Sequence, residues 1–210
     1  TYYGQNTYIP SSLQTVVITG GTSISNAAFY NCGNLKSITL PDSVTNIGED
    51  AFQDCVSLES ITLGNKLTSI GTWMFYGCRS LKSITIPDGV KSIGKQAFSG
   101  CSSLESITIP DSVTSIGYSA FDSCSSLRSI TIPNSVTNID KYIFSYCSSL
   151  KSVTFGNGVT SISSDTFYKC SSLESITIPD SVRSIGSYAF RYCSNLTRIT
   201  FNGTMAQWNT

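Results

Sequence analysis

Eight cysteines recur at a fixed interval in this sequence of 210 residues, and thiols are groups that can bind metal, form disulfides or attack a substrate. They are Cys32, Cys55, Cys78, Cys101, Cys124, Cys147, Cys170 and Cys193. Zinc sites take pairs of cysteines that lie a few residues apart, and the even spacing contains no such pair. The pattern instead indicates one cysteine in each structural repeat.

Histidine is absent from the sequence, which removes the general base that a cysteine or serine nucleophile commonly needs. Glu49 and Asp50 form the only adjacent acidic pair, and Asp88 and Asp111 occupy equivalent positions one interval apart. The first pair is typical of a solvated surface, and the other two aspartates are typical turn residues. We therefore predict no catalytic residues, no metal site and no cofactor, and we expect that the protein is not an enzyme.

Tyrosines and basic residues gather in the C-terminal half of the sequence, around the repeated cysteine positions. Tyrosine and arginine are enriched where proteins bind their partners. The candidate partner-binding residues are Lys141, Tyr142, Tyr146, Tyr168, Lys169, Tyr188, Arg191 and Tyr192. The alternative is that the tyrosine rings simply cover the outer side of the chain, with their hydroxyl groups in water. The residue types leave both interpretations open.

Charge and hydropathy exclude two classes of partner. Thirteen basic and thirteen acidic residues cancel, and charged residues make up only 12% of the chain. Without a basic stripe we expect no nucleic-acid partner. No apolar run reaches the length of a membrane span, so we expect no membrane insertion by this segment.

The elements that must position these side chains follow from the constant interval between the cysteines. The decamer CSSLESITIP occurs unchanged at 101–110 and 170–179. A phenylalanine and a leucine keep the same interval as the cysteines: Phe29, Phe52, Phe75, Phe98, Phe121, Phe144, Phe167 and Phe190, and Leu35, Leu58, Leu81, Leu104, Leu127, Leu150, Leu173 and Leu196. Three columns in one register identify a repeat protein whose stacked coils share a continuous core.

Each coil contains one clear strand signal. Apolar and hydroxyl residues alternate over residues 106–109, which is typical of a strand with one buried face. Pro110 ends the strand, because it has no N–H group for a ladder, and Asp111 opens a turn. Nine such strand positions follow, beginning after Leu13 and ending after Leu196.

The segment Ala120-Phe121-x-x-Cys124 follows Gly117 and has apolar residues three or four positions apart. This spacing predicts one short helical turn with Phe121 and Cys124 on its inner side. Stacked coils would hold the Cβ atoms of neighbouring cysteines about 5 Å apart, beyond the roughly 3.5–4.5 Å that a disulfide needs. We expect a column of small, buried, unreactive thiols.

The repeated pattern L-x-x-I-x-I-P-x-x-V-x-x-I-G-x-x-A-F-x-x-C-x-x-L resembles the BspA-type, or Treponema-type, class of leucine-rich repeats over residues 13–210. The resemblance implies a curved solenoid with a parallel sheet. It also implies a cell-surface or secreted protein, bacterial or from a parasitic protist, with a role in adhesion or host-protein binding. The expected fold is an α/β repeat solenoid, a leucine-rich-repeat right-handed superhelix. It has 23-residue repeats, a parallel β-sheet on one face and short helical turns on the other.

The domain organisation follows from the same register. Residues 1–12 are expected to form a partial N-terminal coil or cap, and residues 13–210 a solenoid of about nine coils with the last one incomplete. The first coil is one residue shorter than the others. Met205 and Trp208 still occupy core columns where the sequence ends, so we expect further domains or repeats beyond Thr210.

The strand positions form an outward face of serines and threonines beside a column of charges. The charge column is Lys36, Glu59, Lys82, Glu105, Arg128, Lys151 and Glu174. Its signs mostly alternate, so neighbouring coils can pair their charges. This face is best interpreted as structural. Threonine arrays on solenoids also resemble ice-binding surfaces, which is a remote alternative.

These observations together predict a non-enzymatic, adhesin-like module, extracellular or at the cell surface, that binds a host or neighbouring-cell protein or glycan. The alternative from another functional class is a structural spacer, a rigid stalk that displays other domains.

Overall fold

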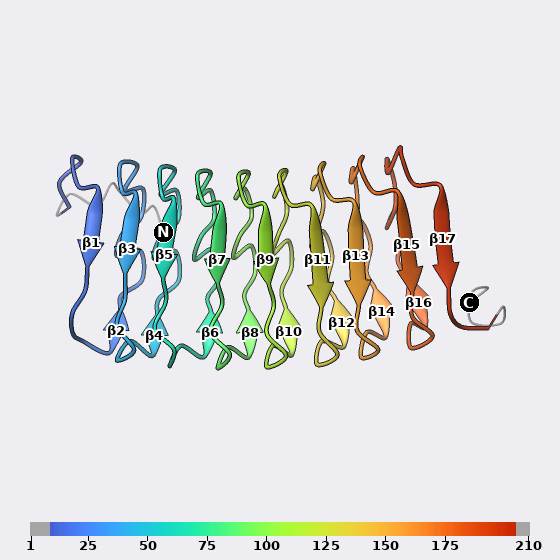
Figure 1. Ribbon diagram of the computed structural model, residues 1–210, viewed down its shortest axis with the longest axis horizontal. Coiled ribbons are helices and arrows are strands. Elements are labelled where there is room, and N and C mark those ends of the chain that lie inside the picture. Colours follow the sequence, from blue (N-terminus) through green and yellow to red (C-terminus); the bar gives the residue numbers. More distant parts are fainter. Residues whose placement is uncertain (1–8, 205–210) are drawn as a thin grey trace.

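The computed structural model describes residues 9–204, which form a row of stacked coils, each built from two strands joined by turns (Figure 1). The longer strands form one column: β1 (Thr15–Val17), β3 (Ser37–Thr39), β5 (Ser60–Thr62), β7 (Ser83–Thr85), β9 (Ser106–Thr108), β11 (Ser129–Ile132), β13 (Ser152–Phe155), β15 (Ser175–Ile178) and β17 (Arg198–Phe201). The two-residue strands form a second column: β2 (Ser23–Ile24), β4 (Asn46–Ile47), β6 (Ser69–Ile70), β8 (Ser92–Ile93), β10 (Ser115–Ile116), β12 (Asn138–Ile139), β14 (Ser161–Ile162) and β16 (Ser184–Ile185).

Strands of successive coils pair in parallel, and each residue lies beside its repeat equivalent. Ser83 pairs with Ser106, one full repeat later. Thr15 pairs with Ser37, which falls just short of a full repeat, so the first coil is the shorter one. The first column contains nine strands in the part of the chain that the structure describes, which confirms the predicted strand positions.

The first-column strand has the in-and-out alternation that the sequence predicts. In β9 the side chain of Ile107 is buried, whereas Ser106 and Thr108 are exposed. Pro110 then leaves the ladder, and its carbonyl accepts the backbone N–H of Val113 at 3.0 Å. That hydrogen bond closes the turn toward the second column.

The second column of strands was not predicted. In β10, Ile116 points into the core and Ser115 points outward, so two residues are enough for one step of the strand alternation. A run of only two residues is too short for a periodic signal in the sequence. It becomes a strand because the equivalent residues of the adjacent coils, such as Ile93, pair with it.

The predicted helical turns are wrong, and the α/β class is wrong with them, because no helix occurs within residues 9–204. A helix would need backbone hydrogen bonds from each N–H group to the carbonyl four residues earlier. Here the N–H of Phe52 donates to the carbonyl of Met74 on the next coil at 3.0 Å, and the N–H of Gln53 donates within its own coil to Asp50 at 3.0 Å. Alternate N–H groups thus point to the neighbouring coil, which a helix does not allow.

Two residues of each coil, four positions apart, make this arrangement possible. Their φ angles lie between 52° and 62° wherever the residue is not glycine, in the left-handed region that L-amino acids rarely adopt. We call these positions the first and second left-handed columns. The first left-handed column is Ala27, Asp50, Trp73, Gln96, Ser119, Tyr142, Asp165 and Tyr188. The second left-handed column is Asn31, Asp54, Gly77, Gly100, Ser123, Tyr146, Lys169 and Tyr192.

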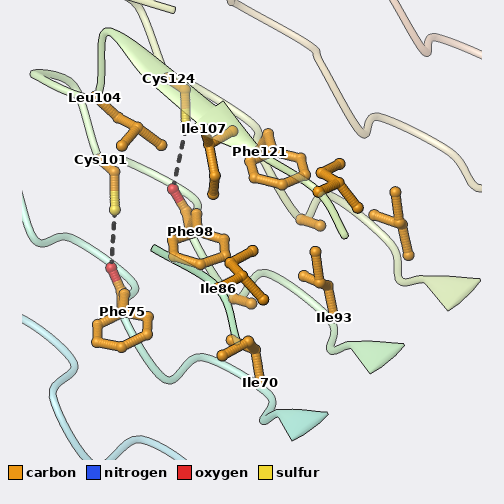
Figure 2. Packing of buried hydrophobic residues seen from close by; sticks show 14 of the residues in the cluster. Ile70, Phe75, Ile86, Ile93, Phe98, Cys101, Leu104, Ile107, Phe121 and Cys124 are labelled. Atoms are coloured by element: carbon orange, nitrogen blue, oxygen red, sulfur yellow. Dashed lines mark hydrogen bonds between the residues drawn. The ribbon is translucent and has the colours of Figure 1, made fainter. Parts of the chain in front are cut away.

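The core lies between the strand columns and the turn segment, and it runs along the whole stack. Phenylalanine rings stack from Phe29 to Phe144 and on through Phe167 to Phe190, with centroids 5.3 to 5.8 Å apart. Figure 2 shows how isoleucines, Leu104 and the cysteines surround this stack. The three predicted core columns are confirmed, while Met205 and Trp208 lie outside the described residues.

Candidate functional site

The turn segment that carries the left-handed residues is the part of each coil that differs most between repeats. Its inner residues, such as Ala120, Phe121 and Cys124, are buried in the core. Some of its polar side chains, such as Asp50 and Ser119, are buried too, but many of the others lie at the surface, where packing does not restrict residue type. Candidate recognition residues therefore concentrate on this edge of the solenoid.

Lys169 lies at the centre of a tyrosine cluster on that edge. Its ammonium nitrogen lies 4.8 Å from the ring centroid of Tyr146, 5.5 Å from that of Tyr168 and 6.0 Å from that of Tyr192. Tyr168 contacts both other rings edge to face, with centroid distances of 5.5 and 5.4 Å. Such contacts hold the cation by attraction to the ring faces.

Arg191 extends the cluster to the next coil. Its guanidinium carbon lies 4.8 Å from the ring centroids of both Tyr188 and Tyr192, and one of its nitrogens donates to the hydroxyl of Tyr192 at 3.1 Å. Tyr188 and Tyr192 are 60% and 54% exposed. We call the cluster the tyrosine flank; it comprises Tyr146, Tyr168, Lys169, Tyr188, Arg191 and Tyr192.

The structure brings together six of the eight candidate residues and leaves the other two apart. Tyr142 belongs to the first left-handed column and packs edge to face against Tyr118 at 5.6 Å. The negative charge of Asp165, assisted by a hydrogen bond, raises the pKa of the Tyr142 hydroxyl. Lys141 is exposed, and its backbone N–H is bound by the carboxylate of Asp140 at 2.7 Å.

Reasoning from the sequence missed a second aromatic cluster. Lys95 lies 5.4 Å from the ring of Trp73 and 5.6 Å from that of Tyr118, and the indole N–H of Trp73 donates to Gln96 at 2.9 Å. Lys95 precedes the first left-handed column. Lys95 comes close to two aromatic residues of adjacent coils only because the coils stack in register.

A shallow groove of about 610 Å³ lies beside the tyrosine flank and shares three residues with it. We call it the serine groove; it is lined by Gly100, Ser102, Ser123, Ser125, Tyr146, Ser148, Lys169, Ser171 and Tyr192. The concavity has a simple cause. The second left-handed column carries the small residues Gly100 and Ser123 in two coils, and large side chains begin at Tyr146.

The floor of the serine groove is a ladder of serines that directly follow the cysteines. The hydroxyl of Ser125 donates to the backbone carbonyl of Ser102 at 3.3 Å, and that of Ser171 donates to the carbonyl of Ser148 at 3.3 Å. A signal for this floor was present in the sequence. The residue after cysteine is serine from coil to coil beginning at Ser102, whereas the three preceding coils have Gly33, Val56 and Arg79.

Asp122 lies beside the floor but does not line the groove. Its carboxylate accepts hydrogen bonds from the hydroxyl groups of Ser123 at 3.2 Å and Ser99 at 3.5 Å. Burial raises the pKa of this carboxyl group, while the serine hydroxyl groups oppose the rise. The carboxylate is therefore already occupied by hydroxyl donors of the protein.

The strand face has the exposure that the sequence predicts, since Thr108 and its equivalents are exposed. Of the predicted charge pairs between coils, the described residues contain one ion pair, Arg128 with Glu105 at 3.6 Å. Both side chains of the ion pair are largely exposed, so it adds little stability. A second shallow depression, of about 520 Å³, lies over the second strand column and includes Thr114, Ser115, Asn138, Asp140 and Ser161.

The cysteines form no disulfides in the structure, and six of the eight are fully buried. Each thiol from Cys55 onward donates to a phenylalanine carbonyl of the preceding coil, as Cys101 and Cys124 do in Figure 2. Burial raises the pKa of Cys55 to about 12 and that of Cys193 to about 11. The expected column of buried thiols is confirmed for Cys55 to Cys170, while Cys32 and Cys193 are half-buried.

Within residues 9–204, no group of three or more cysteine, aspartate or glutamate side chains is arranged to hold a metal ion. Among the same described residues, no helix has the length and hydropathy needed to cross a membrane.

Comparison with known proteins matches the repeats to one family. The family described as BspA type leucine rich repeat region (6 copies) matches residues 22–151 and 114–210. A search of curated protein sequences finds no match. The matched family is a repeat family and does not indicate a catalytic activity.

Solved structures give the same fold. A leucine-rich-repeat protein from T. pallidum is 31% identical with a TM-score of 0.69, over 88% of this chain and 78% of that one. A leucine-rich-repeat protein from Bacteroides ovatus is 30% identical with a TM-score of 0.60, over 90% of this chain and 64% of the other. The pneumococcal vaccine antigen PcpA is 19% identical with a TM-score of 0.54 and shares the fold, and this chain covers 54% of it.

Proposed function

Because the chain belongs to the BspA-type leucine-rich-repeat family, we propose that it is a non-enzymatic binding module of a secreted or cell-surface protein. Its partner is a protein or glycan of a host or a neighbouring cell, bound in an adhesin-like role. The observation that carries this proposal is the tyrosine flank, where four tyrosines and two basic residues on adjacent coils form one exposed cluster.

The residue types of the flank support recognition over simple coverage of the core. Phe167 and Cys170 fill the core of their coil and are fully buried. Tyr188 and Tyr192 remain more than half exposed, so their rings contribute little to packing. Exposed tyrosine and arginine side chains are common energetic anchors in protein interfaces. Lys169 and Arg191 contact rings, which leaves their charges available to an anionic group of a partner.

The test is binding of the 210-residue protein to an immobilised panel of extracellular-matrix proteins, mucins and glycans. We expect at least one specific ligand, and we expect the double variant Tyr188→Ala with Tyr192→Ala to weaken its capture at least tenfold. Losing two anchors of this type costs about 2 kcal/mol or more.

Lys36→Gln with Lys82→Gln is the matched control, because both lysines are exposed on the strand face. These substitutions should leave capture and the unfolding midpoint unchanged. If no member of the panel binds, or if the strand-face variant loses capture while the flank variant does not, the flank is not the recognition surface. The chain would then fit the role of a structural spacer.

A further inference from the structure

The floor of the serine groove offers hydrogen-bond acceptors to a ligand. A serine hydroxyl has one donor hydrogen and two acceptor lone pairs. In Ser102, Ser125, Ser148 and Ser171 the hydrogen is directed to a backbone carbonyl of the preceding coil. The oxygen atoms that face the groove then keep lone pairs that can accept hydrogen bonds from a ligand. A chain rich in hydroxyl groups supplies donors of this kind to one coil after another.

The groove carries a single charge, and it is positive. Lys169 is the only charged residue among the nine that line it. Asp122, the adjacent acid, is bound by the hydroxyl groups of Ser99 and Ser123. One cation pairs with one anionic group of a chain, so most of the contacts in the groove must be uncharged. Nucleic acids and densely sulfated chains instead draw most of their binding free energy from many cations.

The wall of the groove supplies exposed aromatic rings. Tyr146 is 46% exposed and Tyr192 is 54% exposed, and both line the groove on the side where it meets the flank. A tyrosine ring presents an apolar surface next to a polar hydroxyl group. Sugar rings have the matching character, with a face of C–H groups and a rim of hydroxyl groups.

The spacing of the coils distinguishes a sugar chain from a peptide. Successive coils lie about one strand spacing apart, roughly 4.7–4.9 Å where their strands pair, and their buried phenylalanine rings repeat every 5.3 to 5.8 Å. An extended peptide presents equivalent N–H groups about 6.7 Å apart, since each residue rises by about 3.3–3.4 Å. Its donors would lose register with the serine ladder within a few coils. Each pyranose ring of a polysaccharide carries several hydroxyl groups in different directions, so such a chain can present a donor to every coil.

We propose that the serine groove binds a polysaccharide that carries carboxylate groups. Its hydroxyl groups donate to the serine ladder, one or more of its rings pack against Tyr146 and Tyr192, and a carboxylate pairs with Lys169. This proposal specifies the chemical class of the partner, and it rests on the binding function proposed above.

The experiment uses the 210-residue protein and three uronate polymers, polygalacturonate, alginate and hyaluronate, each beside its carboxyl-reduced neutral form. Isothermal titration calorimetry should detect binding to at least one uronate polymer, and carboxyl reduction should weaken it at least tenfold. Lys169→Gln and Tyr146→Ala should each weaken binding about tenfold. Lys151→Gln, on the strand face, and Tyr118→Ala, outside the groove, should have no effect.

A matched pair of substitutions in the floor tests the groove without removing the cation. Ser125→Asp and Ser125→Asn have similar size and both lose the serine hydroxyl, but only the first adds a negative charge. We expect Ser125→Asp to bind the uronate polymer at least tenfold more weakly than Ser125→Asn, with equal unfolding midpoints.

Three outcomes would overturn the assignment: no binding to any uronate polymer, equal binding of the reduced forms, or tighter binding of poly-glutamate than of the uronates. If the protein still captures a matrix protein or neutral glycan through Tyr188 and Tyr192, only the ligand class fails. If the panel and the polymers all fail, the binding function fails with it.

Discussion

Each buried cysteine in the central coils joins two coils through a hydrogen bond. The carbonyl of Phe98 accepts the backbone N–H of Cys101 at 3.1 Å and the thiol of Cys124, one coil later, at 3.2 Å. Both lone pairs of that carbonyl are thus used inside the core. Burial raises the pKa of these thiols, which keeps them protonated and able to donate. Cysteine suits the position because it is small and apolar and still carries a weak donor.

This arrangement predicts slow reaction of the thiols in the folded protein. A pKa of about 12 leaves roughly one Cys55 thiol in ten thousand as the reactive thiolate at pH 8, and burial blocks access as well. We expect iodoacetamide at pH 8 to leave Cys55 through Cys170 unmodified, with labelling confined to the half-buried Cys32 and Cys193. Mass spectrometry of peptides measures the labelling of each cysteine. In denaturant, all eight cysteines should be labelled. Rapid labelling of Cys124 without denaturant would contradict the assignment.

The turn segment is the element in which local conformation and coil pairing depend on one another. Two left-handed residues in each coil direct alternate N–H groups to the neighbouring coil, as Phe52 and Met74 show. A left-handed conformation costs an L-residue roughly 1–2 kcal/mol. The hydrogen bonds between coils, repeated along the stack, offset this cost. The sequence contains the corresponding signal: the sixteen positions of the two left-handed columns contain no valine, isoleucine, threonine or proline.

A β-branched residue at such a position should be destabilising. Ser123 has a φ of 60°, a region in which a β-branched side chain costs more than the serine it replaces, so Ser123→Thr should lower the free energy of unfolding by about 1 kcal/mol. The hydroxyl group that binds Asp122 is retained, so its loss cannot cause the effect. Ser125→Thr is the control, because Ser125 is only two residues away but does not have a positive φ. Chemical denaturation compares the two, and equal effects would refute the explanation by backbone conformation.

The whole molecule is a one-dimensional stack in which each coil contacts its neighbours. Phe121 stacks on Phe98 at 5.4 Å and on Phe144 at 5.8 Å, whereas Phe29 stacks on Phe52 at 5.4 Å and is only partly buried. Stability in such an array is close to a sum of terms within coils and between neighbours. A central phenylalanine therefore contributes to two interfaces.

Replacing a phenylalanine by alanine should lower the free energy of unfolding more at the centre of the stack than at its end. Phe121→Ala should lower the free energy of unfolding by about 3–5 kcal/mol, the usual range for a fully buried phenylalanine. Phe29→Ala should cost about half as much, because its ring is half-buried. Urea denaturation of both variants, followed by circular dichroism, gives the comparison. Equal losses would mean that the chain unfolds without regard to position in the stack.

Much of this architecture could be predicted because the information is periodic and local. The columns of Phe121, Cys124 and Leu127 share one constant interval, so stacking and burial followed from that interval alone. The strands of the first column followed from alternation, and the shorter first coil followed from counting. The tyrosine flank was largely predictable too, because its members lie at equivalent or adjacent positions of consecutive repeats.

The sequence by itself thus determined the repeat, the core columns, the first strand column and most of the flank. Only the tertiary structure decided that the turn segment is not a helix, that thiols bind carbonyls of the preceding coil, and that small residues at Gly100 and Ser123 open a groove beside Tyr146. The physical reason is common to all three. Residues three and four apart share a side in a helix and in this turn segment alike, so the periodicity cannot distinguish them. Hydrogen bonds between neighbouring coils favour the observed turn over a helix, and these bonds form only when the coils are stacked.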